Sequence, residues 1–119
     1  MNRAARWLSV FAALCCGLSV ALGAYASHAA EGKARERIAL AALFAFAHGL
    51  GLLVLARQER SRWLMAAMGC QAAGVILFSG SLVCAAFFAW STVLAPAGGT
   101  LLIAGWFLVA VAICLRRDP

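Results

Sequence analysis

The chain has 119 residues, of which 66% are hydrophobic and 12% charged, with a formal net charge of +6. A soluble domain is roughly half apolar and about one quarter charged, and at this length it buries only about two-thirds of the surface of its unfolded chain. This sequence lacks the polar exterior that such a domain needs. Composition therefore excludes a soluble globule and predicts a protein whose first partner is the lipid bilayer.

Two apolar segments come first along the chain. Residues 7–26 carry no charge, and residues 38–56 are interrupted only by His48. A transmembrane helix needs about 20 predominantly apolar residues, so each segment predicts one span. The first segment also resembles a cleaved signal peptide, because Arg3 and Arg6 precede it and small residues end it. It is longer than the usual signal core of about 7–15 residues, which favours a retained span.

Residues 63–115 contain no charged side chain. At about 1.5 Å per residue this stretch is too long for one span, so the chain has to turn within it. Proline and glycine favour a helix break, which places the predicted turn at 95–99 and the last two spans at 64–87 and 100–115. Backbone groups in lipid must be satisfied internally. The sequence therefore predicts an all-α, polytopic membrane helical bundle of four transmembrane helices, forming a single domain over 1–119.

The basic residues predict the orientation of these spans. With four spans, the two termini and the middle loop share one side, where we count seven Lys and Arg against three on the other side. The seven are Arg3, Arg6, Arg57, Arg60, Arg62, Arg116 and Arg117, and the three are Lys33, Arg35 and Arg37. The positive-inside rule then places both termini in the cytoplasm. The clusters are short and lack stacking or groove-reading neighbours, which indicates contact with anionic lipid and excludes nucleic acid as a partner.

The cysteines give no sign of a metal, cofactor or disulfide site. All five lie in apolar segments, at Cys15, Cys16, Cys70, Cys84 and Cys114, and no Cys-x-x-Cys motif occurs. In such segments cysteine behaves as a small hydrophobe with an inert thiol. His28 and His48 are separated in depth by roughly 12–16 Å at the helical rise, which does not suit two axial ligands of one haem. The sequence predicts no metal and no cofactor.

Polar side chains inside the spans are the candidates for function, because a polar group in hydrocarbon is costly. His48 lies halfway along the second span, and Gln71 lies at a similar depth in the third. We expect the two side chains to hydrogen-bond across a helix interface. Two interpretations remain open: a bond that fixes helix register, or a proton-handling or ligand-contacting role for the imidazole.

His28, Ser79 and Ser81 complete this candidate polar cluster in the outer half of the bundle. The five side chains could line an outward-facing cavity. The alternative is tight helix packing, in which small residues let backbones approach and hydroxyls bond to carbonyl groups. The residues predicted to serve packing or turns are Gly23, Gly80, Pro96, Gly98, Gly99, Gly105 and Trp106.

All acidic residues lie outside the predicted spans, at Glu31, Glu36, Glu59 and Asp118. A four-helix exporter resembling the small multidrug resistance family would carry a membrane-embedded carboxylate for proton coupling. Intramembrane hydrolysis would require paired carboxylates, a histidine cluster or an activated nucleophile. The sequence offers no catalytic residues, which predicts that the chain is not an enzyme.

Four motifs, in order over nearly the full length, resemble the small four-helix inner-membrane protein family of unknown function that includes bacterial YgdD. They are LGAY at 22–25 leading to His28, His48 with its following apolar run, LFSGSL at 77–82, and PAGG at 96–99 leading to AGW at 104–106. The resemblance implies four spans in the bacterial inner (plasma) membrane. It implies no chemistry, because the family has no established activity.

Two positions depart from that family's pattern. Ala26 and Ser27 replace a second Gly-Ala pair before the first histidine, and Phe44 and Ala45 stand where the family often has Tyr-Gln. We therefore expect an integral membrane protein of unknown biochemical activity that is non-catalytic. Its predicted role is structural or accessory, as a homo-oligomer or within a larger membrane complex. The alternative is a small transporter, channel or lipid- or small-molecule-binding protein that uses the polar cluster.

The first testable prediction concerns topology. A reporter fused to the carboxyl terminus should report the cytoplasm, and one inserted near Gly98 should report the opposite side, because seven basic residues lie on one side and three on the other. Paired phosphatase and fluorescent-protein fusions measure this. A carboxyl terminus outside the cytoplasm would contradict the predicted orientation.

Overall fold

The computed structural model describes residues 2–58 and 61–117, and this part of the chain forms four helices. They are α1 (Arg3–His28), α2 (Gly32–Leu55), α3 (Arg62–Phe88) and α4 (Ala95–Cys114). At about 1.5 Å per residue the helices are roughly 30–40 Å long, enough to cross a hydrocarbon layer of about 30 Å. Each is also apolar enough to span a membrane, so the all-α, four-span fold is confirmed.

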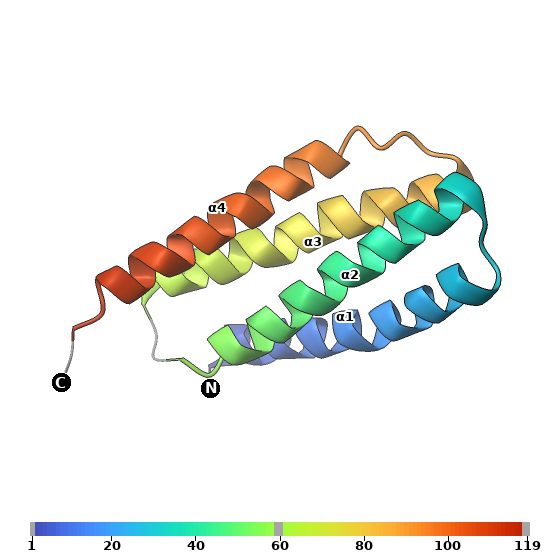
Figure 1. Cartoon of the computed structure of the whole chain (residues 1–119). Helices are drawn as coiled ribbons and strands as arrows, with labels where there is room; N and C mark the ends of the chain where they lie inside the picture. The colour runs from blue at the N-terminus through green and yellow to red at the C-terminus, as the bar shows by residue number, and fades with distance from the viewer. Residues whose placement is uncertain (1, 59–60, 118–119) are drawn as a thin grey trace.

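The helices run up and down in chain order (Figure 1). α1 packs on α2, α2 on α3 and α3 on α4, whereas no Cα atom of α4 lies within 8 Å of α1 or α2 among the described residues. The start of α1, the end of α2, the start of α3 and the end of α4 lie at one end of the molecule, and the α1–α2 and α3–α4 connections lie at the opposite end. α2 and α3 are therefore the inner helices, and α1 and α4 are the edges.

Two apolar clusters hold this arrangement. The larger one draws on all four helices and lies toward the end that holds both termini. It consists of Ala12, Leu52, Leu55, Ala56, Leu64, Ala67, Met68 and Val109. The smaller one joins α2, α3 and α4 through Ala45, Val75 and Leu102. Large apolar side chains outside these clusters, such as Leu18 on α1 and Phe107 on α4, are exposed on the faces that lipid would cover.

Helix ends follow local hydrogen-bonding rules. The Asn2 side chain accepts a bond from the Ala5 N–H at 2.7 Å, and Ser61 accepts one from the Leu64 N–H at 3.0 Å. Both are N-cap bonds that satisfy an amide of the first helical turn. α2 begins at Gly32, so the basic cluster at 33–37 lies in its first turns and not in a loop as the apolar pattern indicated. Hydropathy locates the part of a helix that lies in hydrocarbon and not the end of the helix itself. A helix can extend beyond the hydrocarbon because long charged side chains reach the interface.

The turn predicted at 95–99 is wrong. α3 ends at Phe88 and is followed by the C-cap residue Ala89, whose φ of 55° is left-handed, and α4 already begins at Ala95. Pro96 lies in the first turn of α4, where the N–H it lacks has no partner to lose. Gly98 lies inside the helix for a packing reason, because a Cβ there would collide with the backbone N of Phe78. Proline and glycine therefore start α4 and fit it against α3.

The other glycines differ in how much space a Cβ atom would have. A Cβ at Gly49 would lie 2.8 Å from the Ala12 carbonyl oxygen, and one at Gly105 would lie 2.7 Å from Cγ of Gln71. Gly23 and Gly80, which we expected to pack helices together, have nothing within 4 Å of that position. Within the chain, close helix approach is therefore carried by Gly49 and Gly105 and not by this second pair.

The second testable prediction compares neighbouring glycines of α4. Gly98→Ala should lower the unfolding free energy by about 1–3 kcal/mol, because overpacked cores lose that much. Gly99→Ala is the matched control, since its Cβ would lie 3.8 Å from the Phe78 ring in ordinary contact. Denaturant titration in mixed micelles measures both. Equal effects of the two changes would show that α3 and α4 do not meet at Gly98.

Candidate functional site

His48 lies at the centre of the polar contacts between the helices. Its side chain is 6% exposed on α2, and both ring nitrogens have partners. Nδ1 lies 2.8 Å from the Phe44 carbonyl oxygen one turn earlier, and Nε2 accepts a hydrogen bond from Trp106 Nε1 of α4 at 3.0 Å. An indole N–H can only donate, so Nε2 is the acceptor and Nδ1 carries the proton.

Aromatic rings enclose the imidazole. The Phe44 ring stacks on it with centroids 5.8 Å apart and an angle of 12°, and the Trp106 ring is tilted by 52° at 5.8 Å. The Trp106 indole also covers Gly51, where a Cβ would lie 3.3 Å from the ring. α4 therefore reaches α2 through this side chain although the two backbones do not meet.

Gln71 does not make the expected hydrogen bond to His48. Its side chain is completely buried on α3, and neither its amide nitrogen nor its amide oxygen has a hydrogen-bond partner among the described residues. Trp106 occupies Nε2 of His48, and the remaining ring nitrogen bonds within its own helix. The prediction used depth along the helices, which both residues share, but the direction of each side chain around its helix decides the contact.

The other members of the predicted cluster do not converge with His48. Ser79 donates to the Ala41 carbonyl oxygen at 2.9 Å, which joins α3 to α2. Ser81 is buried and its hydroxyl has no partner among the described residues. His28 is exposed at the last residue of α1. The structure therefore separates the five residues. His48 and Ser79 each bond to a neighbouring helix, and His28 is exposed. Gln71 and Ser81 are buried without a hydrogen-bond partner among the described residues.

Trp106 is the partner that sequence reasoning missed, although it was among the residues expected to pack. Its position carried a signal: it lies inside α4, away from the interfaces where membrane tryptophans are enriched. An indole N–H there needs an acceptor, and a histidine at mid-span is the obvious one. Within the described ranges, no three His, Cys, Asp or Glu side chains are grouped so that they could hold a metal ion.

Comparison with known proteins places these residues in a family context. The model of a family described as "Protein of unknown function (DUF423)" matches residues 22–99, which include His48 and end before Trp106. The inner membrane protein YgdD of Escherichia coli K12 is 35% identical, over 94% of this chain and 93% of its own. The membrane protein SH2409 of Staphylococcus haemolyticus is 30% identical, over 87% of this chain and 91% of its own. A membrane protein of Haemophilus influenzae is 35% identical over 76% of this chain and 80% of its own, and no solved structure matches.

The third testable prediction concerns the bond between α2 and α4. His48→Leu and Trp106→Phe should each lower stability, and a double-mutant cycle should give a coupling of about 0.5–1.5 kcal/mol, the size measured for interhelical bonds in membranes. The control pairs His48→Leu with Trp63→Phe, which shares no contact with it in the structure and should be additive. Additive costs in the first cycle would show that the bond contributes nothing.

Proposed function

The chain belongs to the DUF423 family of proteins of unknown function, and we propose that it is a non-catalytic inner-membrane protein that acts by packing against other membrane proteins, first of all a second copy of itself. The inner-membrane location is the one named for the YgdD relatives, and four apolar helices support it here. The observation that carries the proposal is a row of small residues on the outward face of α1.

Eight of the glycines that lie within helices fall into two groups. One group lies where a Cβ would come closer than 3.0 Å to a neighbouring helix, at Gly49, Gly74, Gly98 and Gly105. The other has nothing within 4 Å of the Cβ position, at Gly17, Gly23, Gly69 and Gly80. A glycine inside a helix costs about 0.5–1 kcal/mol relative to alanine. Contact within the chain explains the first group, and the approach of another protein's helix explains members of the second.

α1 is the helix best placed for such an approach. It is an edge helix that packs mainly on α2, so none of the other described helices covers its opposite face. Ala13, Gly17 and Ala21 are exposed at every fourth position along that face. This spacing lets two helix backbones come close enough for van der Waals contact and weak Cα–H bonds, which drive association in lipid.

A small transporter or binding protein is the second candidate, and one observation favours it. The fully buried Gln71 amide has no hydrogen-bond partner among the described residues, so a polar ligand would satisfy it. Against this, His48 and Ser79 already bond within the protein, and His28 lies apart at a helix end. The predicted outward-facing cavity loses three of its five members in this way, so we favour association.

The fourth testable prediction addresses association through α1. Gly17→Leu should weaken self-association of the full chain in lipid vesicles by about tenfold or more, since loss of close packing removes the main driving force. Gly23→Leu is the control, because Gly23 also has nothing within 4 Å of its Cβ position but is half-buried on a different side of the same helix. Subunit counting by single-molecule photobleaching measures both.

Three results would contradict this proposal. They are a monomeric wild-type chain with no partner after crosslinking in native membranes, an equal loss in both variants, or unchanged association of Gly17→Leu. A Gln71→Leu variant distinguishes the two candidate functions. Self-association should be unchanged in this variant because it does not require the amide, whereas ligand uptake would be lost.

A further inference from the structure

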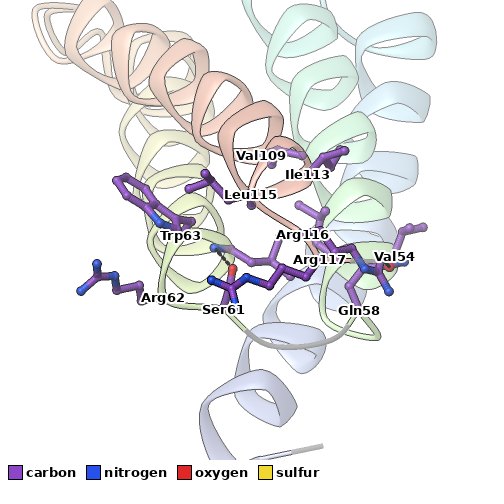
Figure 2. A pocket seen from close by; sticks show the side chains of 13 residues that line it. Val54, Gln58, Ser61, Arg62, Trp63, Val109, Ile113, Leu115, Arg116 and Arg117 are labelled. Carbon is purple, nitrogen blue, oxygen red and sulfur yellow. Dashed lines mark hydrogen bonds between the residues drawn. The ribbon is translucent and has the colours of Figure 1, made fainter. Parts of the chain in front are cut away.

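A cavity of about 820 Å³ lies where α2 and α4 end and α3 begins (Figure 2). Its volume falls within the roughly 300–1,000 Å³ that is usual for ligand sites. It forms because α2 and α4 both pack on α3 but not on each other, so they leave a groove over it. The lining residues used below are Val54, Gln58, Arg62, Trp63, Ala112 and Arg117.

The lining changes from apolar to basic along the helix axes. Toward the bundle it is formed by apolar residues such as Val54 on α2 and Ala112 on α4. Toward the helix ends it is formed by Gln58, Ser61 and three arginines, and no acidic residue is among the thirteen lining residues that the structure describes. Figure 2 shows Arg62 and Trp63 at one edge and Val54 and Gln58 at the other. A molecule that fits has an anionic head and an apolar tail.

Two contacts order side chains at the basic end of the cavity. Arg116 Nη1 donates to Gln58 Oε1 at 3.4 Å, which joins the end of α4 to the end of α2. The guanidinium carbon of Arg62 lies 5.9 Å from the Trp63 ring. Tryptophan typically lies at the headgroup level of a bilayer, so its neighbour Arg62 is at the depth of lipid phosphates. Guanidinium groups bind phosphate oxygens through paired hydrogen bonds.

We propose that this cavity binds one anionic phospholipid, with its head group at the arginines of the basic end and an acyl chain along Val54 and Ala112. The site lies at the end that the positive-inside rule assigns to the cytoplasm, and the cytoplasmic surface of a membrane is rich in anionic lipid. An apolar groove continuous with the basic end distinguishes a lipid from a free anion, which would leave the groove empty. The inference does not depend on the association through α1, which lies at the other edge of the molecule.

Lipid competition measured by native mass spectrometry tests this site. The purified full chain is offered equal amounts of phosphatidylglycerol and phosphatidylcholine with the same acyl chains. The wild type should retain one phosphatidylglycerol in preference. Arg62→Gln together with Arg117→Gln should reduce that preference by about tenfold to thirtyfold. Each basic residue near the membrane surface contributes roughly one order of magnitude or less to the affinity for anionic lipid. Both side chains are exposed, so the fold should be unaffected.

Two further variants separate a seated lipid from general electrostatics. Lys33→Gln with Arg37→Gln removes the same charge at the opposite end of the molecule and should leave the preference unchanged. Ala112→Phe keeps every charge but fills the apolar part, and should abolish retention. Val54→Trp serves if Ala112→Phe does not accumulate, because Val54 is 60% exposed.

Three outcomes would overturn the proposal. An equal loss in the Lys33 and Arg37 variant would show that only net charge matters. Retention unchanged by both groove-filling variants would show that no acyl chain occupies the groove. Displacement of phosphatidylglycerol by inorganic phosphate alone would identify a free-anion site in place of a lipid site.

Discussion

Helices that lie side by side in lipid are not drawn together by the hydrophobic effect, because lipid tails are as apolar as the side chains they would leave. Contact between backbones, and the dispersion energy it provides, then decides which helices pair. In this chain α1 meets α2 at Gly49 and α3 meets α4 at Gly74 and Gly98. Each of these pairs is adjacent in sequence, and the remaining contact between α2 and α3 joins the two pairs into one serial arrangement.

Hydrogen bonds join the α1–α2 pair to the α3–α4 pair. Ser79 on α3 bonds to a carbonyl group of α2, and Trp106 on α4 crosses to His48 on α2. The second bond ties together helices whose backbones do not meet. It uses the imidazole nitrogen Nε2 as the acceptor, while Nδ1 bonds to the Phe44 carbonyl oxygen within α2. Both ring nitrogens of His48 thus have partners within the protein, whereas the side chains of Gln71 and Ser81 are buried without a hydrogen-bond partner among the described residues.

A serial arrangement leaves its unfilled surfaces at the edges, and the two edges differ in chemistry. The outer face of α1 is uncharged through the span and carries small residues, which suits another helix. The groove beside α4 ends in arginines, which suits an amphiphile with an anionic head. Both surfaces arise from the same cause, since α1 packs mainly on α2 and α4 packs on α3 without meeting the backbone of α2. The two sites could therefore be occupied at the same time.

The number of spans and the membrane residence follow from the sequence alone, because the exclusion of charge from hydrocarbon acts on each segment separately. Helix ends were less predictable. Pro96 and Gly98 are turn residues in most contexts, but here proline starts a helix and glycine admits Phe78, a neighbour that only the folded chain provides.

The candidate site shows the same limit. The sequence predicted that His48 and Gln71 lie at one depth, because depth depends on each helix alone. A hydrogen bond between them also depends on how the helices are rotated about their axes and which helices are neighbours. That rotation is set by the close contacts at glycine, so only the tertiary structure could assign Trp106 to His48 and leave the Gln71 amide without a partner among the described residues.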